Sequence, residues 1–361
     1  MKILHISGSF PPIKCGVGDY LQQLLKNMNK IPNVDVHLIT SNECKDMKLE
    51  GVNIYPIIKK WNFSSLNTIV KKVKEINPDV VHIQYPTVNY KNYVAPSFLP
   101  LLIRLIGVRK VVQTWHEPLS KKGIIRYLPN ILIRTKIINV ENSYQKKIPR
   151  IFSFLLKRKS TKYIPIGSNI PKTNLLENEL AEIRNQLVGE NQKNKNIITY
   201  FGFIHPHKGV EDLFEAADPL KDIIILICDL NPNNNYHNEI VSLTNSHKWK
   251  GSVIVTGFLS DKTVADYLAL SDMAIFPFRT GVSERNGSVL AARMQGTFVI
   301  TTSTNRSEHN NVHDNLLYCE PNNIEALKKA IDLYRYKKIE LSNNNRYLSW
   351  EDIASEHIKS Y

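Results

Sequence analysis

The sequence predicts an α/β fold with two domains, each built on a doubly wound parallel sheet. The first observation is length, because 361 residues are too many for one ordinary domain and suit two of similar size. The second is the alternation of short apolar strands with amphipathic helices along both halves, which is typical of parallel sheets. The third is a glycine-containing loop between a strand and a helix in each half, which is where such sheets bind ligands.

The composition narrows the class of protein. The formal net charge is +14 and 42 % of the residues are hydrophobic. A chain with this apolar fraction builds real cores, and its basic surplus favours an anionic partner such as nucleic acid, phospholipid or a phosphorylated substrate. The scattered cysteines fit a reducing compartment and lack the spacing of a disulfide framework or a zinc site: Cys15, Cys44, Cys228 and Cys319. Without an apolar run of membrane-spanning length or a signal peptide, the protein is expected to be cytoplasmic.

The first half opens with a strand, a glycine loop and a helix. Residues 3–7 are short and apolar, which predicts a buried strand, and residues 20–28 repeat apolar side chains at helical spacing. The loop between them contains Gly16, Val17 and Gly18, whose spacing is not that of a dinucleotide fingerprint, so NAD is poorly supported. Further strands are predicted over residues 34–40, 52–58 and 80–84 and from residue 110, with a helix over residues 66–76.

Two strand ends of the first half carry polar side chains. One is Gln84-Tyr85, and the other runs to His116 and Glu117. Ligands of doubly wound sheets bind at the carboxyl ends of strands, so both positions are candidates for a site. A lone histidine is nevertheless usually structural, and the residues alone assign His116 no role.

Residues 121–162 form the most basic stretch of the chain, with lysines and arginines interleaved with apolar side chains. Three explanations fit: amphipathic helices packed on the sheet, a face that contacts anionic lipid, or a nucleic-acid site. The stretch contains no nucleic-acid motif, and charge alone is weak evidence. Our hypothesis is peripheral contact with the inner face of the membrane, which sedimentation with anionic liposomes would test.

The second half begins after the turn-rich residues 163–171, so the domain boundary is expected near residue 170. A helix is predicted over residues 175–189, and an apolar strand over residues 197–201 leads to Gly202. Lys208 follows this strand end and precedes a helix, where its charge can neutralise a diphosphate. The plainer alternative is a surface lysine. Later elements of this half are strands over residues 223–228 and 253–258, a helix over residues 264–270 and terminal helices over residues 322–337 and from residue 349.

Residues 276–302 contain the strongest single pattern, a strand, a polar loop, a helix and a strand in direct succession. The helix is expected to open at Gly287-Ser288 and to stop at Gly296. Free amides at a helix start, with the helix dipole behind them, favour a phosphate group. Taken alone, these residues fit a capped helix in an ordinary α/β domain at least as well.

The neighbouring residues extend the pattern. Residues 283–292 read S-E-R-N-G-S-V-L-A-A, which resembles the nucleotide-sugar site of a variant branch of glycosyltransferase family 4. That resemblance implies retaining enzymes with the GT-B fold, two Rossmann-like domains facing across a cleft. The family usually has two glutamates here; the first aligns with Ser283 and the second with Ala291, and Glu284 lies one place from the first.

Other segments match the same family along the chain. Residues 114–117 are similar to its T-x-H-[DE] strand end, Lys208-Gly209 to its K-G motif, and residues 348–354 to its late S-W-E-x-I-A helix. Phe203 stands where the family has an arginine, and Arg285 is a candidate for the missing charge. The resemblance implies a first domain over residues 1–168, a second over residues 169–345, and a helix over residues 346–361 that returns to the first.

The resemblance also implies a mechanism and its residues. A metal-independent hexosyltransferase would stabilise the departing diphosphate with Lys208, Arg285 and the helix amides, while His116 contacts the transferred sugar. The residues expected to bind substrate are Gly16, Val17, Gly18, Glu117, Gly202, Gly257, Phe258, Leu259, Ser283, Glu284, Asn286, Gly287, Ser288 and Val289.

The expected partners follow from the same resemblance. The donor would be a nucleotide sugar, with UDP the commoner base and GDP the next, and the acceptor a glycan, a glycolipid or another lipid-linked polysaccharide precursor. No cofactor, metal or nucleic acid is expected. Two other functions stay open: a sugar-nucleotide epimerase of the same architecture, and a catalytically inactive nucleotide-sugar binding protein, because both glutamates are absent.

Overall fold

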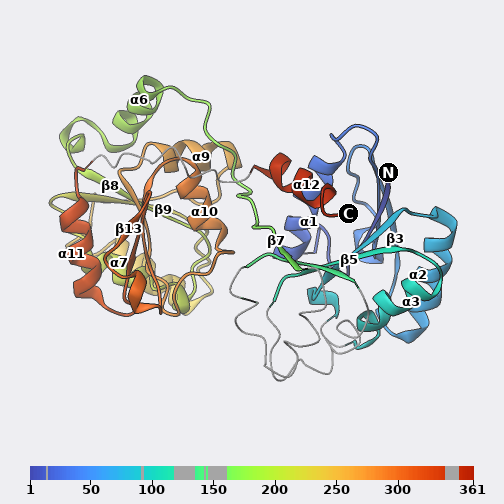
Figure 1. Ribbon diagram of the computed structural model, residues 1–361. Coiled ribbons are helices and arrows are strands. Elements are labelled where there is room, and N and C mark those ends of the chain that lie inside the picture. The colour runs from blue at the N-terminus through green and yellow to red at the C-terminus, as the bar shows by residue number, and fades with distance from the viewer. Residues whose placement is uncertain (14, 91–92, 118–134, 142–143, 145–160, 338–348) are drawn as a thin grey trace. The chain divides into compact units, whose positions relative to one another are not determined.

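The computed structural model describes residues 1–361 except 14, 91–92, 118–134, 142–143, 145–160 and 338–348 (Figure 1). The chain divides into two compact units, and each is described by itself. Unit 1 contains Met1–Gly167 and Leu348–Tyr361, and unit 2 contains Ser168–Tyr347. Among the helices described here, none has the length and apolar character needed to cross a membrane. The basic stretch over residues 121–162 lies mostly outside the described residues.

Unit 1 is built on a seven-stranded sheet with the order β3-β2-β1-β4-β5-β6-β7. Every neighbouring pair of strands is parallel. The strand order reverses between β1 and β4, which makes the carboxyl ends of these two strands the switch point of a doubly wound fold. The strands are β1 (Lys2–Ile6), β2 (Asp35–Ser41), β3 (Val52–Ile58), β4 (Val80–Tyr85), β5 (Lys110–Trp115), β6 (Lys136–Asn139) and β7 (Thr161–Tyr163).

The two faces of this sheet are covered by different helices. Alternate residues of a strand point to opposite faces, so Leu4 and Ile6 join the core under α2 and α3, whereas Ile3 joins the core under α1 and α12. The returning helix α12 packs directly against α1. The helices are α1 (Gly16–Met28), α2 (Phe63–Ile76), α3 (Leu99–Leu105) and α12 (Trp350–Ile358).

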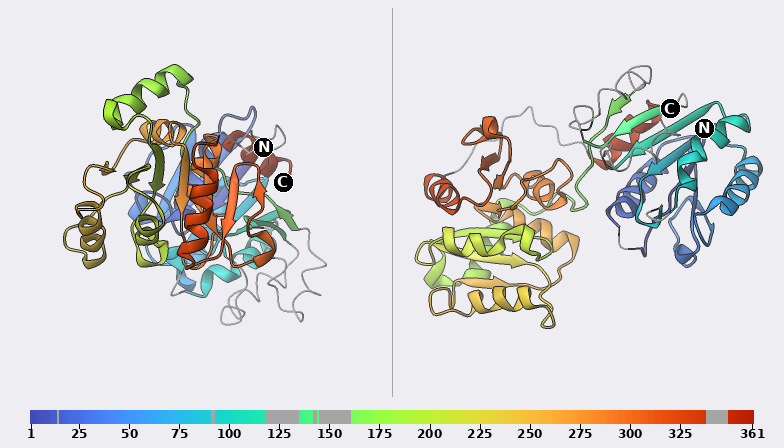
Figure 2. Two further views of the ribbon diagram at one scale, coloured as in Figure 1. Left: turned by 90° about the vertical axis from the view of Figure 1, so that its left-hand side faces the viewer. Right: turned by 90° about the horizontal axis from the view of Figure 1, so that it is seen from below.

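Unit 2 repeats this plan with the strand order β10-β9-β8-β11-β12-β14-β13. Figure 2 shows its strands and helices, in green to orange-red, from two further sides. Its switch point lies between β8 and β11. All its pairs are parallel except β13 with β14, and this antiparallel edge strand was not predicted. The strands are β8 (Asn196–Phe201), β9 (Asp222–Ile227), β10 (Val253–Val255), β11 (Met273–Phe276), β12 (Phe298–Thr302), β13 (Val312–His313) and β14 (Leu316–Cys319).

The helices of unit 2 share one continuous apolar core with its sheet. A buried ion pair adds a specific link. Arg335, which follows α11, donates from Nε and Nη2 to the two carboxylate oxygens of Asp222 at 2.9 and 2.8 Å. Asp222 starts β9, so the pair fixes the end of α11 to the sheet. The helices are α6 (Glu177–Val188), α7 (Val210–Ala216), α8 (Asn235–Thr244), α9 (Asp261–Ala269), α10 (Gly287–Met294) and α11 (Ile324–Tyr334).

Candidate functional site

The candidate phosphate site of unit 2 lies where the loops after β8 and β11 meet at the switch point. The backbone N–H of Arg279 donates to the His207 carbonyl at 3.0 Å, which joins the two loops. Gly209 adopts φ +63°, and a methyl group there would collide with the Pro277 carbonyl oxygen. This position therefore needs glycine, both for its left-handed backbone and for the close approach of the other loop.

Lys208 is held between these loops. It closes the short 3-10 turn Pro206–Lys208 and is half-buried. Its Nζ lies 4.4 Å from the centre of the Phe278 ring, within the range of a cation–π contact. Burial lowers the pKa of the Lys208 ammonium. The Lys208 side chain is thus partly covered, at the surface of unit 2.

Helix α10 begins at Gly287, as predicted, and its first amides lack a side-chain cap among the described residues. The residue before it, Asn286, turns its side chain away from the helix. Its Oδ1 accepts from the backbone N and the Oγ of Ser283, at 2.7 and 3.0 Å. The amides at the start of a helix have no partner within the helix, so the N–H groups of Gly287, Ser288 and Val289 are suited to bind an anion.

The two switch-point strands bring Gly202 and the start of α10 together. A methyl group on Gly202 would lie 3.9 Å from the Ser288 hydroxyl. The turn that precedes α10 leaves Glu284 and Arg285 exposed. Two predicted elements, the strand end at Gly202 and the helix start at Ser288, are therefore neighbours.

The predicted nucleobase residues lie apart from this cluster. Gly257, Phe258 and Leu259 follow β10, which is an edge strand separated from β8 by β9. The Phe258 side chain is 91 % exposed. Within the described part of the chain, no hydrogen bond, ion pair or ring contact joins these three residues to Lys208 or Ser288. The two groups share only the carboxyl edge of the same sheet.

Arg279 is a residue of this loop that the sequence did not single out. It pairs with Glu211 at 2.7 Å and with Asp212 at 3.2 Å, both in the first turn of α7. The sequence feature that could have indicated this role is the acidic pair Glu211-Asp212, which directly follows Lys208-Gly209-Val210. Phe203, at the position of the family's arginine, is 81 % exposed, so nothing in unit 2 covers that position.

In unit 1, His116 is buried directly after β5, with an exposed fraction of 4 %. Its backbone N–H donates to the Tyr85 carbonyl at 2.9 Å, and its Nε2 lies 2.8 Å from Gln84 Oε1. The Tyr20 ring packs edge-on against the imidazole with centroids 4.9 Å apart. Glu117, the next residue, is exposed.

The prediction of a loop over Gly16, Val17 and Gly18 was wrong, because these residues form the first turn of α1. A methyl group on Gly18 would lie 3.2 Å from Phe10 Cα. The glycine thus serves close helix–loop packing at the switch point of unit 1. Gly16 is open to solvent, with nothing within 4 Å of an added methyl group.

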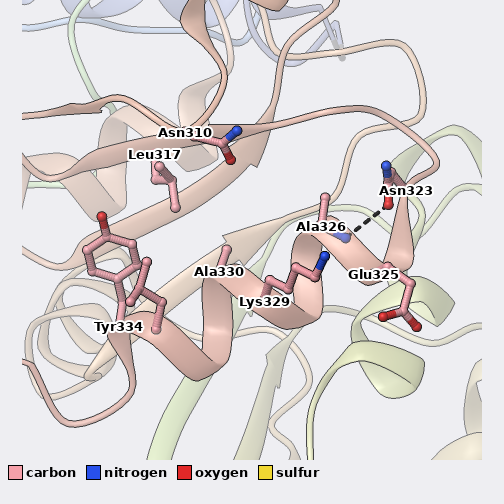
Figure 3. Close-up of a pocket in the computed structure, with 9 residues that line it drawn as sticks. Asn310, Leu317, Asn323, Glu325, Ala326, Lys329, Ala330 and Tyr334 are labelled. Carbon is pink, nitrogen blue, oxygen red and sulfur yellow. Dashed lines mark hydrogen bonds between the residues drawn. The ribbon is translucent and has the colours of Figure 1, made fainter.

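Other features of the described residues lie outside this cluster. The pocket in Figure 3, of about 330 Å³, lies along α11 and contains none of the predicted site residues. No group of three or more metal-ligating side chains is placed to hold a metal within the part of the chain that the structure describes.

Comparison with known proteins identifies the class. A glycosyltransferase from Rickettsia africae ESF-5 has a TM-score of 0.70 and 19 % identity, over 92 % of this chain and 87 % of that one. HepE of Anabaena, solved with UDP, has a TM-score of 0.68 and 15 % identity, over 100 % and 95 %. UDP-GlcNAc 2-epimerase of Methanocaldococcus jannaschii has a TM-score of 0.62 and 15 % identity, over 100 % of both. These likenesses define the fold as GT-B, two Rossmann-like domains.

The family follows from the sequence matches. Residues 183–346 match the glycosyl transferases group 1 family, and residues 20–119 match the glycosyl transferase 4-like family. The two matched segments lie in different units. No curated protein matches the sequence. The chain belongs to the GT4-like glycosyltransferases, which confirms the resemblance.

Proposed function

We propose that the protein is a retaining hexosyltransferase that uses a nucleotide-diphosphate sugar and needs no metal. The observation that carries this proposal is the cluster at the unit 2 switch point. There the Lys208 ammonium, the Ser288 hydroxyl and the uncapped amides of α10 come from the two loops that meet. Such a group of donors is suited to a diphosphate, the leaving group of this reaction.

In the proposed mechanism, cleavage of the bond between sugar and phosphate leaves negative charge on the diphosphate. Lys208, Arg285 and the amides of Gly287 and Ser288 stabilise that charge as it develops. The acceptor attacks the face that the leaving group vacates, and a phosphate oxygen takes its proton. His116 orients the transferred sugar. Retention of anomeric configuration would follow from this order of events and is checked by NMR of the product.

We further propose UDP as the base of the donor and a glycan or lipid-linked acceptor. HepE, a structural neighbour, was solved with UDP and with UDP-glucose, which supports UDP for this chain. A panel of UDP, GDP and ADP in a thermal-shift assay tests the base first. Stabilisation by UDP alone supports the proposal, and stabilisation by another nucleotide alone replaces UDP in it.

The role of the charge is tested with Lys208→Met, which keeps the apolar stem over Phe278. Turnover should fall about 10²–10³-fold, the range for removing one preorganised donor from a transition state. Lys250→Met, at an exposed position of the same unit, is the matched control and should retain activity. Equal turnover in both variants would remove Lys208 from the mechanism.

A sugar-nucleotide epimerase is the second candidate, because UDP-GlcNAc 2-epimerase of M. jannaschii has the same fold. The two reactions differ in their products. A transferase consumes donor in proportion to acceptor, whereas an epimerase alters the sugar without any acceptor. Product analysis with and without acceptor separates them, and binding without turnover in either assay would indicate an inactive binding protein.

A further inference from the structure

A buried chain of polar side chains leads from Tyr361 to His116 within unit 1. It lies on the sheet face covered by α1 and α12. Tyr361 Oη is 2.5 Å from His82 Nδ1, Gln84 Nε2 is 3.5 Å from His82 Nε2, and Gln84 Oε1 is 2.8 Å from His116 Nε2. His82 and Gln84 are fully buried, so water does not compete for these hydrogen bonds.

The chain has a direction, because an amide nitrogen only donates and an amide oxygen only accepts. Burial and neighbouring histidines lower the pKa of His82 well below its usual value, so the ring is neutral and carries one hydrogen. Its Nε2 lies 2.7 Å from the Thr114 hydroxyl as well as near the Gln84 amide nitrogen. Because the Gln84 amide nitrogen only donates, His82 Nε2 accepts from it, and His82 Nδ1 donates to Tyr361.

The structure places the Gln84 amide with Nε2 toward His82 and Oε1 toward His116. The reverse orientation would require the other His82 tautomer, with its hydrogen on Nε2, and would make His116 Nε2 the acceptor. Gln84 therefore presents Oε1 to His116, whose Nε2 carries the ring hydrogen. When the His116 ring bears a single hydrogen, its lone pair is then on Nδ1.

We infer that Gln84 is a positioning residue that holds His116 as the Nε2–H tautomer with a fixed ring orientation. The tautomer decides which nitrogen of His116 accepts and which donates. Its consequence for catalysis rests on the proposed function, in which His116 contacts the transferred sugar. The tautomer itself is a property of unit 1 and holds whatever the reaction is.

The surroundings support a fixed ring rather than a mobile one. The backbone N–H of His116 is bound to Tyr85, and its carbonyl accepts from the Tyr144 hydroxyl at 2.8 Å. The Tyr20 ring packs on the imidazole, and the Tyr20 hydroxyl is 2.8 Å from His357 Nε2. The titratable groups around the chain include His5 on β1, Tyr20 on α1, Lys162 on β7, and Glu356 and His357 on α12.

The first test needs only the unchanged protein. Histidine labelled with ¹⁵N distinguishes a ring nitrogen that bears hydrogen from one that does not, and the spectrum of His116→Asn assigns the signal among 11 histidines. We expect Nε2–H for His116 near neutral pH. An Nδ1–H ring in the unchanged protein would overturn the inference, whatever the variants do.

The second test replaces Gln84. Gln84→Met removes the acceptor and should release His116 from the Nε2–H form. Gln113→Met is the matched control. Gln113 is an equally buried glutamine on β5, where it bonds Thr135 and Trp115 instead, and its loss should leave the His116 tautomer unchanged.

The third readout is turnover. We expect Gln84→Met to lower kcat about tenfold, the effect of one hydrogen bond in the transition state, and Gln113→Met to leave it unchanged. A changed tautomer with unchanged kcat would refute the positioning role. If the unchanged protein transferred no sugar at all, the proposed function would fail while the NMR result on Gln84 stood.

Discussion

Acidification should destabilise unit 1 because three histidines are buried there as neutral rings. Burial lowers the pKa of His5 and of His357 to about 3, from 6.5, and the pKa of His82 also lies well below its usual value. Below pH 6.5 the unfolded chain binds protons that the folded unit does not bind. Stability is therefore full above the unfolded pKa and falls as the pH drops below it.

The magnitude follows from linkage. Between about pH 7.5 and about pH 5.5, each such histidine costs about 1.4 kcal/mol of unfolding free energy. The three together cost about 4 kcal/mol, a large share of the stability of an ordinary domain. His5→Leu should reduce the loss by about 1.4 kcal/mol. It should cost little at neutral pH, since neither ring nitrogen of His5 has a hydrogen-bond partner among the described residues.

The assay is urea unfolding followed by tryptophan fluorescence. Unit 1 contains Trp61, Trp115 and Trp350, and unit 2 contains Trp249. A Trp249→Phe background therefore makes the signal specific to unit 1. The reasoning is refuted if His5→Leu loses as much stability on acidification as the parent does.

Three further perturbations test other parts of the structure. Gly209→Ala should lower the melting temperature of unit 2 in calorimetry and weaken nucleotide binding, because its left-handed backbone strains alanine by about 1 kcal/mol before the collision with Pro277; unchanged melting would contradict the loop geometry. Asp222→Asn should cost about 3 kcal/mol in the same assay, because buried Arg335 keeps only its second partner, the half-exposed Asp332, whereas Glu190→Gln, in an exposed pair with Lys193, should cost less than about 1 kcal/mol; equal losses would refute this. Phe203→Arg should tighten UDP binding about tenfold in titration calorimetry, and unchanged affinity would place the diphosphate elsewhere.

The fold class was predictable because it depends on local periodicity. Short apolar strands and amphipathic helices define their own positions, and the helix start at Gly287 was found from its loop and glycine alone. The edge strand β13 was not predicted, because a strand of two residues is too short to show an alternating apolar pattern. It is recognised as a strand only through its pairing with β14. The strand predicted over residues 253–258 ends at Val255, which pairs with Leu226, the last residue but one of its single neighbour β9.

The candidate site was predicted only in part, because some of it is made by tertiary contacts. The Gly16–Gly18 pattern indicated a loop, yet both glycines belong to a helix, and Gly18 lies against Phe10. The polar chain behind His116 joins residues hundreds of positions apart. Strand register places Gln84 beside Thr114, and the return of α12 brings His357 and Tyr361 to the same face.

The return of α12 also orders events during synthesis on the ribosome. Trp350, Ile353 and Ala354 complete a core whose other side chains belong to residues 3–164. All of unit 2 is translated between these two parts. The nascent first unit must therefore wait, with the apolar side of α1 uncovered, until the whole second unit has emerged. If translation paused within the segment that encodes unit 2, this surface would stay uncovered for longer, and a chaperone that shields it would be needed for that whole time.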